Sequence, residues 1–538
     1  MTASLKQASI LIIDDFQGMR TMLREFVKSM GVTRIDTASH GKDAMSQLSN
    51  GNYDIVICDY NLGEGQNGQQ ILEEAKLRNY IGVSTIWVMV TAEKTPDMVM
   101  GAAEVKPDDY LLKPINQVLL ENRLEKLIAR KQSLGGIEKA IKARDYLGAI
   151  GLCDQQLKTQ VVNPQEILRI KSDLLLTMGD FDAARALFEA VLAVRSVPWA
   201  STGLGKILFH AKEYAKARDL FEQVLNENKV YMEASDWLAR TLVALGEGEK
   251  AQRVLLEAVK LSPNSPTRQK TLGETAFNNG SLDVAQAAFE KTIKIGEYSP
   301  HKNPAVFAGL AKVLSEKDAP AEALKVLERS KKEFKHNTLA SIQTAAAESM
   351  VYTRMGQPEK AQAAMAGAQQ LMEKISGKVS PEIAMDLAQS MFKMGQKDQA
   401  CELLRDVVKN NHENGELSRH VEALFERENL ADEGQTLIKQ SRQEVIDINN
   451  QGVTLAKEGD FLAGAKLLRT AIKTLPNNEV IMVNLCGLLI GLMTKEGRNE
   501  AMVSEVRGLL DRVRELNPAN RKCMLYAAAL ARLGSSGG

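Results

Sequence analysis

The sequence contains few cysteines, tryptophans and prolines. Among its 538 residues are 5 cysteines, 3 tryptophans and 14 prolines, and no two cysteines form a C-x-x-C pair. Scattered cysteines are typical of a reducing compartment and exclude a disulfide-stapled secreted fold. We therefore expect a cytoplasmic protein without a secretory leader, in which the cysteines are small apolar core residues.

The sequence also lacks an excess of charge and a long apolar run. Lys plus Arg and Asp plus Glu both total 68, so no overall field attracts the chain to nucleic acid or to an anionic membrane. No apolar run approaches the roughly 20 residues that span a bilayer. The 6 histidines lack the spacing of a metal site. We expect neither a membrane nor nucleic acid as a direct partner.

The first 131 residues alternate between short apolar runs and segments of helical period. The runs predict five strands: Ser9 to Ile13, Thr33 to Thr37, Tyr53 to Cys58, Thr85 to Val90 and Asp109 to Leu112. Strands that alternate with helices predict an α/β domain with a five-stranded parallel sheet of flavodoxin-like type, covered on both faces. In such sheets the functional residues gather beyond the carboxyl ends of the strands.

Five polar side chains follow these strand ends: Asp14, Asp15, Asp59, Thr91 and Lys113. Adjacent acids repel one another unless they share a cation, so the three acids predict a divalent metal site. Mg²⁺ suits it, because this ion takes few protein carboxylates and completes its shell with water and phosphate oxygens. The threonine and the lysine add a hydroxyl and a point charge for a phosphoryl group. The pattern therefore predicts a phosphoryl-transfer site.

Four signatures in this order resemble the receiver domain of bacterial-type two-component response regulators. They are Ile10-Leu11-Ile12-Ile13-Asp14-Asp15, Cys58-Asp59-Tyr60-Asn61, Thr91-Ala92-Glu93 and Tyr110-Leu111-Leu112-Lys113-Pro114. The resemblance covers about the first quarter of the chain. It implies that Asp59 accepts a phosphoryl group from a histidine kinase or a phosphotransfer protein.

The same resemblance implies the metal ligands. Asp15, Asp59 and the backbone carbonyl of Asn61 would hold Mg²⁺, with Asp14 acting mainly through a water. The loop from Asn61 to Gly68 lacks the Met-Pro pair that is usual in the family. Because residues beside the acceptor control access of water, the lifetime of the phosphorylated form does not follow from the sequence.

The remaining roles concern phosphoryl binding and switching. Lys113 and Thr91 would hold the phosphoryl oxygens as charge develops on them. Tyr110 would be the switch aromatic that turns inward when the threonine moves, and Pro114 would be the family's cis-proline. Receivers signal through their fourth helix, fifth strand and fifth helix, so we expect this face beside the rest of the chain or beside a partner in a homodimer.

After residue 131 only helical period remains, and it repeats. Ala184, Ala217, Ala251 and Ala285 lie 33, 34 and 34 residues apart, and a large side chain follows each four residues later: Phe188, Phe221, Leu255 and Phe289. This pattern resembles the tetratricopeptide repeat, in which paired helices stack into a superhelix. The spacing widens to 38–39 residues among Ala323, Ala361 and Ala400, which predicts longer helices or loops.

The inner helices of such a superhelix line a groove that binds extended or helical segments of other proteins. We expect a protein or peptide ligand there. Candidate groove residues, each of which is also compatible with an ordinary turn or solvated helix position, are Asn278, Asn279, Arg354, Asn449, Asn450 and Asn484.

A chain of this length predicts several domains. We expect a receiver at 1–131, a linker helix with the first helical pair at 132–163, an all-α repeat superhelix at 164–533 and a flexible tail at 534–538. The leading hypothesis is a response regulator whose repeats act as an adaptor, with no enzymatic output beyond receiver self-phosphorylation and self-dephosphorylation. The alternative is a transcription-linked regulator that acts through a transcription factor, an anti-sigma system or RNA polymerase.

Overall fold

The structure is a computed structural model that describes residues 5–92, 104–131, 134–159, 163–375, 379–517 and 520–535. The chain forms two compact units. The first unit comprises Met1–Leu174 and Asp182–Val306, and the second comprises Leu175–Phe181 and Phe307–Gly538. This division does not coincide with the receiver boundary expected at residue 131, because the receiver packs against the helices that follow it.

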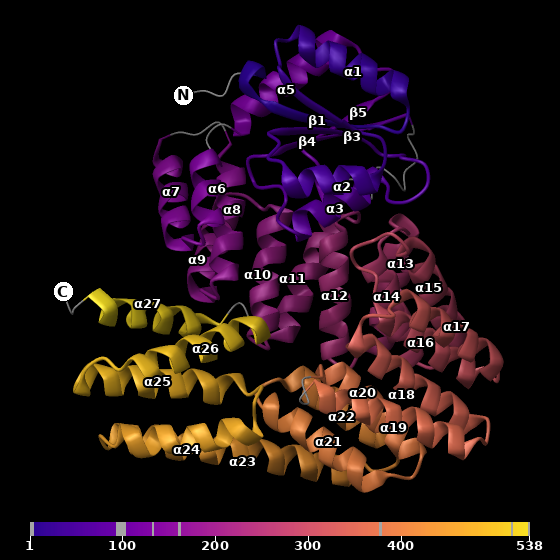
Figure 1. The fold of residues 1–538 in the computed structure, drawn as a ribbon, viewed down its shortest axis with the longest axis vertical. Helices are drawn as coiled ribbons and strands as arrows, with labels where there is room; N and C mark the ends of the chain where they lie inside the picture. Colours follow the sequence, from indigo (N-terminus) through magenta and orange to yellow (C-terminus); the bar gives the residue numbers. More distant parts are fainter. Residues whose placement is uncertain are drawn as a thin grey trace. The chain divides into compact units, whose positions relative to one another are not determined.

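The N-terminal domain contains a five-stranded parallel sheet in the order β2-β1-β3-β4-β5 (Figure 1). Its strands are β1 (Ser9–Ile13), β2 (Arg34–Ala38), β3 (Ile55–Asp59), β4 (Ile86–Thr91) and β5 (Asp109–Leu112). The predicted α/β fold is confirmed. The first and last runs match their strands, and the other three are displaced by one or two residues toward the C-terminus.

Helices cover both faces of the sheet (Figure 1). They are α1 (Gln17–Ser29), α2 (Gly41–Asn50), α3 (Gly68–Leu77) and α5 (Gln117–Lys131). Alternate residues of a strand point to opposite faces. Ile10 and Ile12 accordingly pack with residues of α1 and α5, whereas Leu11 and Ile13 pack with residues of α2 and α3. The helix expected between the fourth and fifth strands lies mainly outside the described residues.

The rest of the first unit consists of helices arranged in pairs. They are α6 (Gly135–Lys142), α7 (Tyr146–Lys158), α8 (Pro164–Thr177), α9 (Phe181–Val194), α10 (Pro198–His210), α11 (Tyr214–Glu227), α12 (Met232–Ala244), α13 (Gly248–Leu261), α14 (Pro266–Asn278) and α15 (Leu282–Ile295). The end of α8 and the first residue of α9 fall within Leu175–Phe181, which belongs to the second unit.

The small and large residues of the repeat pattern are buried as expected. Ala217 is 0% and Phe221 is 0% exposed. A Cβ atom at Gly205 on α10 would lie 2.5 Å from the Phe221 ring, so only glycine allows α11 to approach this closely. Gly246 and Gly280 occupy the turns between paired helices with positive φ, which glycine adopts without strain.

The second unit continues the helical array. Its helices are α16 (Pro304–Glu316), α17 (Pro320–Glu333), α18 (Thr338–Arg354), α19 (Pro358–Lys374), α20 (Pro381–Lys393), α21 (Lys397–Asn410), α22 (Gly415–Arg427), α23 (Ala431–Lys457), α24 (Phe461–Thr474), α25 (Glu479–Glu496), α26 (Glu500–Leu516) and α27 (Arg521–Ser535). Helix α27 ends at Ser535, and the remaining residues of the tail expected at 534–538 lie outside the described residues.

Helix lengths explain where the repeat period becomes irregular. Helices α18 and α19 have 17 residues each, against 13 or 14 in the pairs α10–α15 of the first unit, which accounts for the wider alanine spacing. Helix α23 has 27 residues. Gly434, near its start, lies against Phe425 of α22, and Gly452, in its second half, lies against Leu468 of α24. One continuous helix therefore belongs to two successive pairs.

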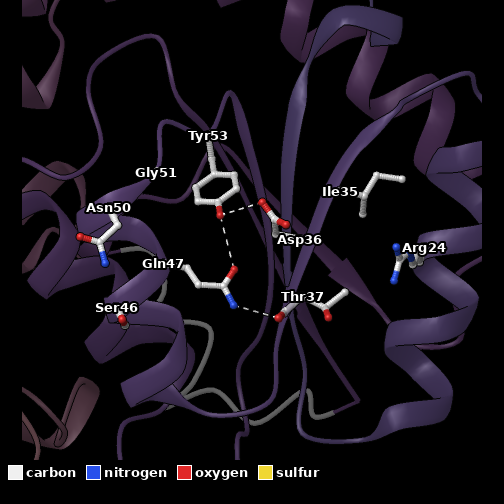
Figure 2. A pocket seen from close by; sticks show the side chains of 9 residues that line it. All are labelled: Arg24, Ile35, Asp36, Thr37, Ser46, Gln47, Asn50, Gly51 and Tyr53. Atoms are coloured by element: carbon white, nitrogen blue, oxygen red, sulfur yellow. Dashed lines mark hydrogen bonds between the residues drawn. The ribbon is translucent and has the colours of Figure 1, made fainter.

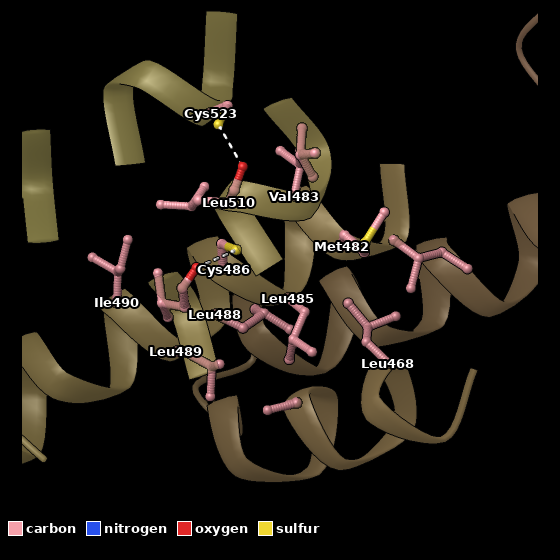
Figure 3. Close-up of a cluster of buried hydrophobic side chains, with 14 of the residues drawn as sticks. Leu468, Met482, Val483, Leu485, Cys486, Leu488, Leu489, Ile490, Leu510 and Cys523 are labelled. Atoms are coloured by element: carbon pink, nitrogen blue, oxygen red, sulfur yellow. Dashed lines mark hydrogen bonds between the residues drawn. The ribbon is translucent and has the colours of Figure 1, made fainter. Parts of the chain in front are cut away.

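Two hydrophobic clusters meet along α23. One cluster spans residues between Ile342 and Leu437, and the other spans residues between Val445 and Leu530. Figure 3 shows the second cluster, in which Cys486 and Cys523 point among leucine, isoleucine and methionine side chains. The interpretation of these two cysteines as core residues is therefore confirmed. No helix among the described residues has both the length and the apolar character needed to cross a membrane.

A buried polar contact joins two turns of the second unit. Asn478, which is 0% exposed, donates a hydrogen bond to the carbonyl of Lys409 (2.7 Å) and lies 3.1 Å from Nδ1 of His412. Its own side-chain oxygen accepts from the backbone of Ile481. The Asn478 amide thus presents its NH₂ group to the imidazole, which can accept this hydrogen bond only in the neutral form.

We predict that this contact makes the second unit sensitive to acid. Burial lowers the pKa of His412 below its ordinary value, so below about pH 6.5 the unfolded chain takes up a proton that the folded chain does not. The free energy of unfolding should include the full contribution of this contact above that pH. At lower pH it should decrease by up to about 1.4 kcal/mol per pH unit. Chemical denaturation at several pH values should show this slope, and His412→Gln should reduce it. The prediction would be contradicted if the unfolding free energy of His412→Gln depended on pH as in the wild type, while the variant His420→Gln, at an exposed position, showed the smaller slope.

Candidate functional site

Three acids converge at the carboxyl end of the central strands. Asp14 and Asp15 directly follow β1, and Asp59 ends β3, the neighbouring parallel strand. One oxygen of each carboxylate lies within 4.8 Å of the others. Asp14 is 1% and Asp59 7% exposed, whereas Asp15 is exposed to solvent. This convergence is the one that the strand ends predict.

Lys113 supplies the positive charge of the site. Its Nζ atom lies 2.7 Å from Asp59 Oδ2 and 3.0 Å from Asp14 Oδ2. The lysine follows β5, and its backbone N–H donates to the carbonyl of Thr91 at the end of β4. The Lys113–Pro114 peptide bond is cis, as the resemblance implies. The ammonium group is thereby held between the two buried carboxylates.

The first acid is fixed by its own loop. Asp14 Oδ1 accepts a hydrogen bond of 2.9 Å from the backbone of Phe16. Arg20, on α1, donates to the backbone carbonyls of Asp14 (2.6 Å) and Asp15 (2.9 Å). These contacts orient the two adjacent carboxylates without neutralising them, because the guanidinium binds their carbonyls.

Burial and charge act against each other at the acceptor. Burial is the largest influence on Asp59 and raises its pKa above the ordinary value, although the hydrogen bond from Lys113 and another from the backbone of Asn61 lower it. Burial alone would lower the pKa of Lys113, but its hydrogen bonds and charge interactions with Asp59 and Asp14 outweigh burial and raise it. Burial also raises the pKa of the Cys58 thiol, so this neighbour stays a neutral core group.

The loop after the acceptor is shaped by glycine. Gly63 has a φ of +70°, and a Cβ atom there would lie 3.6 Å from Asp15 Oδ2. A Cβ atom at Gly68 would collide with the backbone oxygen of Asp59, so α3 can begin this close to the strand end only with glycine. Asn67 caps α3 by accepting from the backbone of Gln70.

The two residues expected to switch lie on the neighbouring strands β4 and β5. Thr91 is 1% exposed and pairs in register with Leu112, one residue before Lys113. Tyr110 is half-buried and packs against the cluster that contains Met89. The hydroxyl, the ammonium and the acceptor therefore occupy one end of the sheet, and the aromatic ring lies on the strand that ends there.

The receiver contacts the following helices through residues that the sequence pattern did not indicate. Arg130, on α5, binds Glu166 of α8 through two hydrogen bonds of 2.7 and 3.1 Å. Glu138, on α6, accepts from the backbone of Ser84 at 2.7 Å. The receiver face that is expected to signal is only partly covered by these helices, since Val118 on α5 remains 67% exposed.

A second candidate site is a hollow of about 530 Å³ beside the edge strand β2. Figure 2 shows Tyr53 directed toward Asp36 and Gln47 in this hollow. The Tyr53 hydroxyl donates to Asp36 at 2.9 Å, and burial together with this contact raises its pKa to about 12. None of the three clustered acids lines this hollow, so it is separate from the acid site.

The residues proposed for the repeat groove are scattered. Asn484 on α25 donates to Asn449 on α23 at 2.7 Å, which joins two helices. Arg354 pairs with Glu316 and Asp318 at the ends of neighbouring helices. The other three candidates lie at the end of α14 (Asn278 and Asn279) and on α23 (Asn450). These positions form no single site in the described residues.

Comparisons with known proteins agree with the geometry. Residues 10–125 match the response regulator receiver domain, and residues 171–229, 208–273 and 384–411 match tetratricopeptide repeats. The chemotaxis protein CheY of Pseudomonas aeruginosa is 31% identical over 121 residues, which are 22% of this chain and 96% of that protein. CheY-3 of Vibrio cholerae is 28% identical over 125 residues, which are 23% and 95% of the two chains.

Solved structures also align with separate parts of the chain. The chemotaxis response regulator CheY4 of Vibrio cholerae is 23% identical with a TM-score of 0.21, and the alignment covers 22% of this chain and 98% of that one. A tetratricopeptide repeat protein from Parabacteroides merdae is 14% identical with a TM-score of 0.34, over 49% and 99%. Through its first domain the chain belongs to the response regulator receiver family, and that domain is followed by tetratricopeptide repeats.

Proposed function

We propose that this protein is a phosphorylation-controlled adaptor of a two-component phosphorelay. Asp59 accepts a phosphoryl group from a histidine kinase or phosphotransfer protein, and the repeats bind a partner protein in a manner that depends on that group. The observation that carries the proposal is the position of Lys113, whose ammonium group lies within 3.0 Å of two buried carboxylates beside a third, exposed one.

The cluster suits Mg²⁺. Three carboxylates with oxygens within 4.8 Å and a single neighbouring ammonium leave a net negative site that a divalent cation would neutralise. Asp14, Asp15, Asp59 and the backbone carbonyl of Asn61 are the residues that would hold it. Bound there, Mg²⁺ would supply positive charge for the phosphoryl oxygens.

The protein's own residues then perform the transfer. A carboxylate oxygen of Asp59 forms a bond to phosphorus while the phosphorus–nitrogen bond of the donor phosphohistidine breaks. The imidazole of the donor leaves with the electron pair and keeps one proton. Lys113 and the Thr91 hydroxyl bind oxygens of the transferred group, so this contribution to catalysis is positional and electrostatic.

The test is phosphorylation of the full chain by acetyl phosphate in millimolar Mg²⁺. We expect about one acid-stable, hydroxylamine-sensitive phosphoryl group per chain, and none after chelation of the metal. A captured partner should then bind the phosphorylated chain and the Asp59→Ala variant with different affinities. Absence of label in Mg²⁺, or equal partner affinities in all states, would contradict the proposal.

A further inference from the structure

The receiver contacts the repeats at two places that are far from the domain junction in sequence. Glu104 and Lys106, which precede β5, lie against α12 and α14. Gln66 and Gln70 donate to the carbonyls of Tyr298 (3.1 Å) and Ile295 (3.2 Å), at the end of α15. All these residues belong to the first compact unit.

Arg268 is the centre of the first contact. It lies in the first turn of α14 and is only 2% exposed. Its guanidinium binds Asp236 of α12 through two hydrogen bonds of 2.7 and 2.9 Å and binds Glu104 of the receiver through two more of 3.1 Å. Two carboxylates thus share one arginine, and only Asp236 belongs to the repeats.

A second ion pair between receiver and repeats lies beside Arg268, and in this pair the receiver supplies the positive charge and the repeats supply the negative charge. Glu233, also on α12, binds Lys206 of α10 and lies 3.5 Å from the ammonium of Lys106. We call Lys206, Glu233, Asp236 and Arg268 the repeat charge cluster. Its four charges sum to zero, and it receives one negative and one positive charge from receiver residues two positions apart.

The receiver holds these two side chains in a fixed arrangement. Lys76 on α3 donates to the carbonyls of Val105 (2.6 Å) and Lys106 (3.0 Å). Lys106 directly follows the helical residues Glu104 and Val105 and has a φ of +56°, in the left-handed region. A residue with a Cβ adopts this conformation at a cost, so the turn is stabilised by its surroundings.

We propose that the repeat charge cluster is the binding site for a partner-protein segment that offers a carboxylate and an amino group, and that Glu104 and Lys106 occupy this site as an intramolecular competitor. Charge complementarity supports this assignment. Without the two receiver side chains, the cluster presents the guanidinium edge that Glu104 now binds and the Glu233 carboxylate beside it. A zwitterionic pair satisfies both groups, and a purely acidic or purely basic segment does not.

This inference deepens the proposed function and rests on it for its regulatory part. Gln66 lies in the loop that follows Asp59, and Lys106 lies in the segment that leads to Lys113. Both contacts with the repeats are therefore made by chain segments that lead directly to residues of the phosphorylation site. A rearrangement there would displace the competitor and free the cluster, and by linkage a bound partner would favour phosphorylation.

The test uses the full chain and a fluorescent peptide with the sequence of residues 104–110, Glu-Val-Lys-Pro-Asp-Asp-Tyr. Glu104→Gln combined with Lys106→Gln removes the competitor's charges. We expect this variant to bind the peptide at least about tenfold more tightly than the wild type, because the wild-type site is already occupied. Fluorescence anisotropy measures both dissociation constants.

Two further variants locate the binding. Added to the double variant, Arg268→Gln or the more exposed Glu233→Gln should each abolish the gain, whereas Lys270→Gln, which removes a positive charge elsewhere on α14, should leave it unchanged. Glu233→Gln keeps the test decisive if loss of the buried arginine unfolds the repeats. Equal binding to the wild type and the double variant, or no binding to either, overturns the proposal.

A separate arm distinguishes this proposal from the proposed function. Phosphorylation of the wild type with acetyl phosphate should also raise its affinity for the peptide. If the charge variants behave as expected but phosphorylation has no effect, the binding site stands and its control by Asp59 fails. If phosphorylation changes the affinity for a captured partner but the charge variants do not respond, the adaptor function stands and this site is wrong.

Discussion

Asp59→Asn is expected to abolish labelling of the protein by acetyl phosphate. The substitution keeps the size of the side chain but removes the nucleophilic oxygen, so incorporation should fall from about one phosphoryl group per chain to background. Radiolabelled donor followed by gel analysis measures it. Mass spectrometry after borohydride reduction should place the wild-type modification on Asp59.

The matched control is Asp36→Asn on β2, which removes a carboxylate of the same domain outside the cluster. It should be labelled like the wild type. Labelling of Asp59→Asn at the wild-type level would show that another group accepts the phosphoryl moiety. The interpretation of the acid cluster as a phosphorylation site would then be wrong.

Lys113→Met should have the second large effect. It leaves Asp14 and Asp59, which are 1% and 8% exposed at their side chains, without the cation that binds both. Breaking a buried ion pair by removal of one partner costs about 3–5 kcal/mol. Amide hydrogen exchange of β3, measured in chelator, should accelerate by about two to four orders of magnitude.

Millimolar Mg²⁺ should restore part of this protection, because the metal replaces the missing positive charge. Labelling should slow by about a hundredfold even in Mg²⁺, since one electrostatic contact to the transferred group is lost. Lys126→Met removes an exposed lysine of α5 and should change neither quantity. If Lys113→Met exchanged like the wild type in chelator, the lysine would not stabilise the buried acids.

The site could be predicted because its residues follow strand ends. A parallel sheet brings the carboxyl ends of neighbouring strands together, so Asp14 and Asp59 had to converge once β1 and β3 were neighbours. The same rule placed Lys113 next to them. The predicted boundaries of the strands were less accurate. Because Tyr53 is apolar in character, the third predicted strand began there, but in the structure Tyr53 lies before the first residue of β3.

The contacts between receiver and repeats could not be predicted. Glu104 and Arg268 are 164 positions apart, and neither belongs to a motif or a periodic apolar pattern. An arginine in the first turn of a helix looks like a solvated residue until the fold brings Asp236 and the receiver to it. Such partners depend on packing across helices, which the local pattern of one sequence does not contain.

The repeat pattern was informative where helix lengths were regular. It indicated the pairs between Ala184 and Ala285 and the lengthening around Ala361, and the helix lengths agree. It did not indicate that α23 continues from Ala431 to Lys457, because a shared helix contains no turn glycine or proline that would mark the end of one pair and the start of the next.

That shared helix has a mechanical consequence. At about 1.5 Å per residue, its 27 residues form a rod about 40 Å long. Arrays of stacked helix pairs flex by small rotations between consecutive pairs, and a continuous rod prevents such a rotation wherever it spans two of them. Bending of the second unit around a ligand therefore cannot occur within α23 and must take place at the other connections between helix pairs.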